Sequence, residues 1–200
     1  MFTTIKKYVT PILIILYTVG FVGICFFPSL GLTDVSELNL LVSFALILLP
    51  APIQDLWKKI GVIFLLGMSV EILGVATGYP FGNYHYGDSL GSKLFDVPII
   101  IGINWFMTAY ISYHLAKSFL NNPYIRIVSA TLLMLLLDFL LEPIAPKLDY
   151  WHWENDVIPA MNFVSWYLVG LACVYIIDLN NNETINRSAR NLFFIQLVFF

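Results

Sequence analysis

Long apolar runs, separated by short polar segments, constrain this chain more than any other feature of its sequence. A helix needs roughly 20 mostly apolar residues to cross the hydrocarbon of a bilayer, which is about 30 Å thick. Six runs approach or exceed that length, although one of them also carries two acidic residues. They cover about residues 8–27, 38–53, 60–77, 98–117, 125–147 and 158–178. We therefore predict an all-α integral membrane protein.

The number of spanning helices is predicted to be six or seven. The last apolar stretch, Asn191–Phe200, is too short to cross by itself and would need to begin earlier, near Asn186. Composition agrees with a membrane protein: 59% of residues are hydrophobic and 12% are charged, whereas soluble domains average about 45–50% and 25%. No repeat or linker divides the chain, so we expect a single transmembrane domain over residues 1–200.

Basic residues predict the orientation, because short cytoplasmic loops retain Lys and Arg. Eight of the ten basic residues, Lys6 among them, fall on segments that share the side of the N-terminus, against Lys93 and Lys147 on the other. We expect a cytoplasmic N-terminus in a multi-pass protein of the cytoplasmic membrane. The loops near 78–97 and 148–157 would then face outward. A net charge of −3 offers no basic face for nucleic acid, which leaves lipid and lipophilic molecules as the expected partners; the oligomeric state is open.

Three carboxylic acids lie inside the predicted spans, and a fourth, Asp178, lies at the inner end of the sixth. Ionisable groups at bilayer depth are costly, and they usually face the interior of the bundle and serve a function. Glu71 lies in the third run, and Asp138 and Glu142, four residues apart, share one face of the fifth. Stripes at helical spacing point to the same interior: Gly67, Glu71, Gly74 and Gly78; Asn104, Thr108 and Ser112; Asn162 and Trp166. Each stripe alone fits a packing seam, but together they favour a shared cavity.

Two predicted outer loops combine aromatic and ionisable residues. Residues 78–88 contain Tyr84, His85 and Tyr86, and residues 149–154 read Asp-Tyr-Trp-His-Trp-Glu. An interfacial aromatic belt would account for the rings alone, yet the histidines and acids beside them favour a functional role. With three His in all and no ligand spacing, the chain predicts no metal site. It also lacks a phosphate-binding or dinucleotide fingerprint, so we expect no cofactor.

The chemistry that remains is proton transfer by a carboxylic acid in an apolar, aromatic cavity. Burial favours the neutral acid, which then holds a proton to donate. Aromatic faces stabilise a nearby cation. An acid and an aromatic box together suit the protonation of an isolated alkene, which produces a carbocation. A cavity within the bilayer implies a lipid-soluble substrate.

The same residues resemble the membrane carotenoid hydratases. The first matching block runs from Glu71 through Thr77-Gly-Tyr-Pro-Phe-Gly-Asn-Tyr-His-Tyr86 to Asn104-Trp105. The second joins Asp138-x-x-x-Glu-Pro-x-Ala145, Tyr150-Trp-His-Trp153 and Ile158-Pro-x-x-Asn-Phe-x-x-Trp166. The chain departs from the pattern at Ser92, often Pro, at Asp96, often a small residue, and at Glu142, often Asp. The resemblance covers about residues 65–170.

This resemblance implies a hydro-lyase of the γ-carotene, lycopene or bisanhydrobacterioruberin hydratase type, which adds water across the terminal 1,2 double bond of an acyclic ψ end. From the residues themselves, we expect Glu71 to donate the proton and Asp138, Glu142 or His152 to orient water or take its proton. Two alternatives stay open: a lycopene cyclase, which starts from the same protonation, and a proton-coupled transporter. The residues expected to contact the substrate are Tyr84, Tyr86, Asn104, Trp105, Trp151, Trp153, Asn162 and Trp166.

Overall fold

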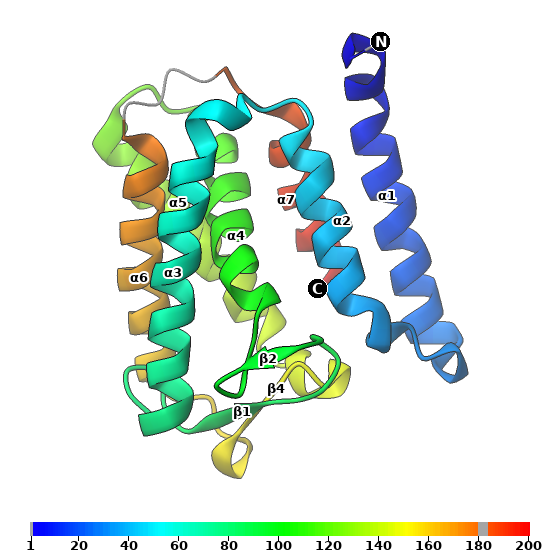
Figure 1. Ribbon diagram of the computed structural model, residues 1–200, viewed down its shortest axis with the longest axis vertical. Coiled ribbons are helices and arrows are strands. Elements are labelled where there is room, and N and C mark those ends of the chain that lie inside the picture. The colour runs from blue at the N-terminus through cyan, green and yellow to red at the C-terminus, as the bar shows by residue number, and fades with distance from the viewer. Residues whose placement is uncertain (1, 180–183) are drawn as a thin grey trace.

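The computed structural model describes residues 2–179 and 184–200; the side chains of residues 2–6, including Lys6, and of residue 55 lie outside the description. Within these ranges the chain forms a bundle of seven α-helices with short strands at one end (Figure 1). Four of the helices are long and apolar enough to cross a membrane: α1, α3, α5 and α6. The helices are α1 (Phe2–Phe26), α2 (Ser36–Leu48), α3 (Ile53–Thr77), α4 (Ile100–Lys117), α5 (Pro123–Leu141), α6 (Ala160–Asp178) and α7 (Arg187–Phe199).

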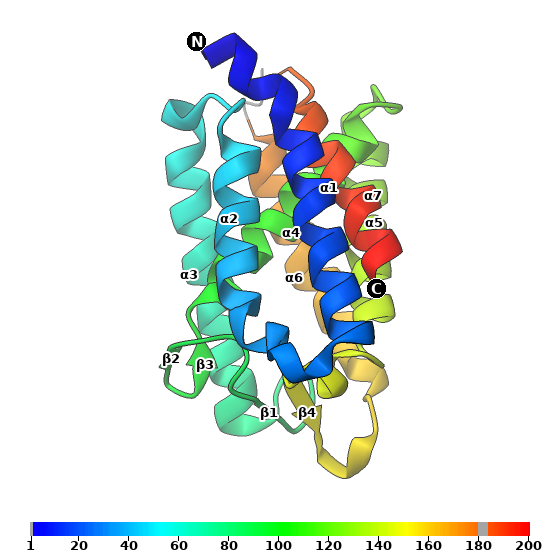
Figure 2. The same ribbon diagram turned by 90° about the vertical axis from the view of Figure 1, so that its right-hand side faces the viewer.

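The prediction of a mostly helical, multi-pass membrane protein is confirmed, whereas six or seven full crossings and the cytoplasmic N-terminus stay predictions. Helices α2 and α7 have 13 residues each, which at 1.5 Å per residue is about 20 Å, shorter than the hydrocarbon layer. Helix α4 is the central element: it contacts α2, α3, α5, α6 and α7, and nearly all of its side chains are buried. Helix α1 lies at the edge of the bundle beside α2 and α7 (Figure 2).

Local sequence explains where helices begin and end. Asn122 caps α5 by accepting hydrogen bonds from the backbone N–H groups of Tyr124 and Ile125, and Asn186 caps α7 in the same way. The seventh helix therefore begins where the sequence suggested. Helix α5 is shorter than the predicted run 125–147, because Pro143 has no N–H with which to continue it. Glu142 consequently lies at the end of the helix rather than within it.

The end of the bundle opposite the N-terminus is closed by two small antiparallel ladders, which the sequence did not predict. Strand β1 (Tyr84–Tyr86) pairs with β4 (Trp151–Trp153), and β2 (Lys93–Leu94) pairs with β3 (Val97–Pro98). Phe95 and Asp96, which connect β2 to β3, have φ values of 50° and 62°. A two-residue turn with both central φ positive is the hairpin geometry that small residues adopt most easily, which gives a physical reason for a small residue at the position of Asp96.

We call this part of the molecule the loop end. Short 3₁₀ turns flank its ladders (Ala145–Leu148 and Glu154–Asp156), and two more, Pro28–Leu30 and Leu32–Val35, join α1 to α2 at the same end (Figures 1 and 2). The helix ends that carry Lys58, Lys117 and Arg187 lie opposite it. The ladder of β1 and β4 thus covers the bundle near the ends of α3, α5 and α6, where it positions the residues described next.

Candidate active site

The β1–β4 ladder sorts its side chains by alternation. Neighbouring residues of a strand point to opposite faces, and the register pairs Tyr84 with Trp153 and Tyr86 with Trp151. These four rings therefore share the face that packs on the bundle, where both tryptophans and Tyr86 are buried. The other face carries the central pair of histidines. The paired strands thus place a layer of four aromatic rings over the helices. We call these rings, of Tyr84, Tyr86, Trp151 and Trp153, the roof.

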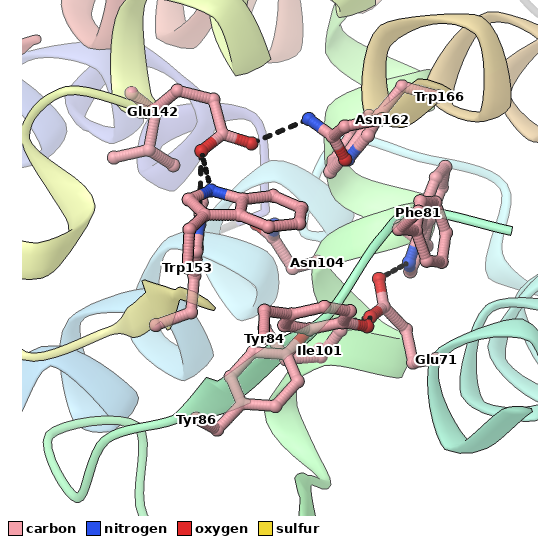
Figure 3. A pocket seen from close by; sticks show the side chains of 13 residues that line it. Glu71, Phe81, Tyr84, Tyr86, Ile101, Asn104, Glu142, Trp153, Asn162 and Trp166 are labelled. Carbon is pink, nitrogen blue, oxygen red and sulfur yellow. Dashed lines mark hydrogen bonds between the residues drawn. The ribbon is translucent and has the colours of Figure 1, made fainter. Parts of the chain in front are cut away.

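Glu71 of α3 lies directly under this roof with both carboxyl oxygens occupied. Its Oε2 accepts hydrogen bonds from the Tyr84 hydroxyl at 2.5 Å and the Tyr86 hydroxyl at 2.8 Å. Its Oε1 accepts from the Trp105 indole Nε1 of α4 at 2.9 Å (Figure 3). The carboxyl group is 4% exposed, so these three donors replace the water that it would otherwise bind.

The glycine stripe of α3 makes room for these donors. A Cβ atom at Gly67 would lie 2.6 Å from Trp105, and one at Gly74 would lie 2.8 Å from both Phe81 and the Tyr84 hydroxyl. Such distances are closer than real Cβ contacts. The stripe predicted as a close-approach surface is confirmed as one, and what approaches it is a set of aromatic side chains.

Glu142 at the end of α5 is held in a second set of donors. The indole Nε1 atoms of Trp151 and Trp153 both donate to its Oε2, at 3.1 and 2.7 Å. The Asn162 amide of α6 donates to its Oε1 at 2.7 Å (Figure 3). The two strands of the roof therefore each bind one glutamate. Strand β1 supplies two hydrogen-bond donors to Glu71, and strand β4 supplies two to Glu142.

Asp138, one turn before Glu142 on α5, differs from both. Its Oδ2 lies 3.5 Å from the Asn162 amide, at the limit of a hydrogen bond. Its Oδ1 is buried and has no partner among the described residues. Asn162 thus stands between Asp138 and Glu142, and it bonds the second far more closely.

Two cavities meet at these carboxyl groups. The first, which we call the aromatic cavity, lies under the roof. All the residues predicted to contact a substrate line it, together with Glu71 and Glu142. Sequence reasoning missed three: Phe81, in the predicted aromatic loop, Ile101, one turn before Trp105 on α4, and Leu141, next to Glu142. Its lining is Glu71, Phe81, Tyr84, Tyr86, Ile101, Asn104, Trp105, Leu141, Glu142, Trp151, Trp153, Asn162 and Trp166 (Figure 3).

The second, which we call the bundle cavity, lies among α1, α2, α4, α5, α6 and α7. Asp138 lines this cavity and not the first. Five residues line both and form their common wall: Ile101, Asn104, Leu141, Trp151 and Trp166. Residues of α1 and α7 also line this cavity. The sequence does not predict this, because Tyr17 and Gln196 look like isolated polar residues in apolar runs. They meet across the bundle through a 3.0 Å hydrogen bond.

The structure places His152 outside the linings of both cavities. It occupies the outer face of the ladder because it alternates with Trp151 and Trp153. Its ring stacks on His85 with centroids 5.2 Å apart, and its Nε2 lies 2.9 Å from Asp149. The hydrogen bond with His152, and a second from the backbone N–H of Asp88, lower the pKa of the Asp149 carboxyl. The contacts among His85, His152, Asp149 and Asp88 therefore stabilise the loop end.

Two other arrangements bear on the chemistry. No group of three or more His, Cys, Asp or Glu side chains is placed to hold a metal within the described ranges. Asp178, the acid predicted nearest to the opposite end, accepts hydrogen bonds from Arg126 and from the Tyr113 hydroxyl. Asp178 thus forms an ion pair with Arg126. It is not part of the group of buried carboxyls formed by Glu71, Asp138 and Glu142.

Comparison with known proteins identifies the family. A family model described as "Carotenoid biosynthesis protein" matches residues 36–200. The chain belongs to the carotenoid biosynthesis protein family. The matched range contains every residue that lines the aromatic cavity. The resemblance noted from the two sequence blocks is confirmed.

One relative of this chain has a name that describes a hydration reaction. Bisanhydrobacterioruberin hydratase of Haloarcula japonica is 30% identical over 122 residues, which are 57% of this chain and 42% of that protein. The match therefore spans less than half the length of the relative. No solved structure matches the chain. The family supports a carotenoid-modifying role.

Proposed function

We propose that this protein is a carotenoid hydratase, a hydro-lyase that adds water across the terminal 1,2 double bond of an acyclic ψ end. The observation that carries the proposal is the cluster of three buried carboxyl groups beside a wall of indole and phenol rings. The name of the Haloarcula relative supports hydration as the reaction type. A lipophilic substrate agrees with a site built between apolar helices.

The reaction has two steps that the site suits. A buried carboxylic acid protonates C2 of the alkene, and a tertiary cation forms at C1. The faces of Trp and Tyr rings stabilise that cation through their quadrupoles, and Glu71 and Glu142 place two carboxyl groups near it. Water then forms the C–O bond at C1, and its extra proton passes to a carboxylate.

We also propose that the N-terminus is cytoplasmic and that the loop end faces outward from the cytoplasmic membrane. The distribution of basic residues supports this: Lys58, Lys117 and Arg187 lie on helix ends opposite the ladders. Water for the second step would then come from the outer side, through the loop end, where the roof meets solvent.

Expression in a host that accumulates lycopene or γ-carotene tests the function. A hydratase yields a product heavier than its substrate by one water, whereas a cyclase yields an isomer of unchanged mass. The control is the same host with Glu71→Gln, Asp138→Asn and Glu142→Gln combined. An unchanged mass with a new ring would assign cyclisation, and a carotenoid pool identical to that of the control would reject both reactions.

A further inference from the structure

We infer that Asp138 is the acid that protonates the substrate, and that the bundle cavity is the binding site for the terminal alkene of the carotenoid. This rests on the hydration proposed above and deepens it, because it names the donor and the place of the end group. It also differs from the expectation drawn from the sequence, in which Glu71 donates the proton.

The hydrogen-bond partners of the three carboxyl groups separate their roles. An indole N–H can donate but cannot accept. The Glu142 oxygen that faces Trp151 and Trp153 must therefore be an acceptor, and so must the Glu71 oxygen that faces Trp105. Each glutamate has three donors, and donors directed at a carboxyl group favour its ionised form. Neither glutamate has a proton directed at a substrate.

Asp138 has the opposite environment. It is 3% exposed, its Oδ1 has no partner in the described ranges, and its one amide neighbour is 3.5 Å from Oδ2. An ionised carboxylate without donors or a cation is costly to bury, and such a group takes up a proton instead. Asp138 therefore presents an O–H group on Oδ1 without an internal acceptor, which leaves that proton available to a ligand.

Asp138, which carries the oxygen without a partner, lines the bundle cavity. Ligand pockets are lined mainly by apolar side chains with a few polar groups, and the bundle cavity has a lining of that kind. Leu40, Leu90 and Leu137 supply apolar wall, which fits an isoprenoid end. Four of its polar members are joined in pairs: Gln196 donates to Tyr17, and Tyr150 donates to Ser36. Among the described residues of this lining, the buried side-chain oxygen without a hydrogen-bond partner is Oδ1 of Asp138.

The common wall explains how a cation formed in the bundle cavity is stabilised. Trp151 and Trp166 line both cavities, so their rings border the end group. Trp166 stacks on Trp105 with centroids 4.2 Å apart, and both Trp105 and Trp151 donate to a glutamate. Hydrogen bonding of an indole N–H to a carboxylate adds electron density to the ring and strengthens its attraction for a cation.

The step balances without a further reagent. The Asp138 O–H bond breaks as a C–H bond forms at C2, and the π electrons of the alkene make that bond. The C1 cation then takes a lone pair from water, which forms the C–O bond. The oxonium returns one proton to the Asp138 carboxylate. One alkene and one water give one alcohol, and the acid is regenerated.

Variants of the donor test the assignment in a lycopene-accumulating host. Each variant is purified and checked for a monodisperse elution profile and for binding of lycopene by absorption. We expect Asp138→Asn to lower the hydration rate by at least about 100-fold, the usual contribution of a positioned acid, and more than Glu71→Gln does. Asp138→Glu, which keeps the acid, should recover part of the rate. A loss in Asp138→Asn equal to or smaller than that in Glu71→Gln overturns the assignment.

A matched pair of tryptophan substitutions tests the cavity without relying on turnover. Leu40 lines the bundle cavity, whereas Leu41, its neighbour on α2, is 39% exposed and lines neither cavity. Leu40→Trp should weaken lycopene binding at least tenfold, and Leu41→Trp should leave it within twofold. Equal binding by the two variants rejects the bundle cavity as the site. A wild-type protein that binds lycopene in this pattern but never hydrates a carotenoid would reject the proposed function and keep the binding site.

Discussion

Trp105 makes two interactions, and substitution by Phe removes one of them while keeping an aromatic ring for the other. Its indole donates to Glu71, and its ring stacks on Trp166. Trp105→Phe keeps a ring but leaves a buried carboxyl oxygen without its donor, which costs about 1–3 kcal/mol. We expect thermal unfolding in detergent to shift down accordingly, and hydration to fall with it.

The control for this substitution is Trp166→Phe. It also shortens a ring of the stacked pair, but Glu71 takes its donors from Tyr84, Tyr86 and Trp105, so the carboxyl group loses nothing. Its unfolding temperature should stay closer to wild type. If the two variants are equally stable, the hydrogen bond to Glu71 does not contribute to the fold as described.

Asp149 links the stability of the loop end to pH. Hydrogen bonds from His152 and Asp88 lower its folded pKa below the unfolded value of about 3.9. The stabilisation is therefore present above the unfolded pKa and is lost as pH falls through the folded pKa. Asp149→Asn should be less stable than wild type at pH 6, and the difference should shrink as the pH falls below the unfolded value.

Unfolding temperatures of the two proteins across that pH range make the measurement. Lys147→Gln, which changes a charge on an exposed residue nearby, serves as the control and should run parallel to wild type at every pH. A gap between Asp149→Asn and wild type that widens toward low pH would contradict the assigned sign.

Helix α3 offers a matched test of the glycine stripe. A Cβ at Gly67 would collide with Trp105, whereas a Cβ at Gly61 on the same helix meets nothing within 4 Å. Gly67→Ala should cost about 1–3 kcal/mol through overpacking and reduce hydration by moving Trp105 from Glu71. Gly61→Ala should instead stabilise by about 0.5–1 kcal/mol. Thermal unfolding and product yield of both variants give the comparison, and equal effects would contradict the steric role of the stripe.

The helices were the most predictable elements, because a long apolar run and a capping Asn are local signals. The range 158–178 came close to α6, and Asn186 marked the start of α7. The β1–β4 ladder was missed because each strand has three residues and its partner lies in a distant loop. The face of the ladder on which His152 lies was therefore also unpredictable, since its direction depends on the strand. The tight clusters of donors on Glu71 and Glu142 were likewise unpredictable, because they join side chains from different elements.

At the scale of the whole molecule, the proposed orientation in the membrane can be tested by labelling introduced cysteines from the outer side. Asn121, between α4 and α5, and Lys147, at the loop end, are both exposed and lie at opposite ends of the bundle. In a background with Cys25 and Cys173 replaced by Ser, we expect an impermeant thiol reagent applied to intact cells to label Lys147→Cys. Asn121→Cys should react only after the membrane is opened. The reverse pattern would place the N-terminus outside.

The distribution of tryptophan gives the protein a built-in optical probe. Of its five tryptophans, four line the aromatic cavity, and Trp57 is 58% exposed on the distant part of α3. Polyenes accept excitation energy from indoles at short range, so a carotenoid seated beside this wall should quench most of the intrinsic emission. Trp57→Phe would remove the one distant emitter, and the residual light would then report the occupancy of the site without any added dye.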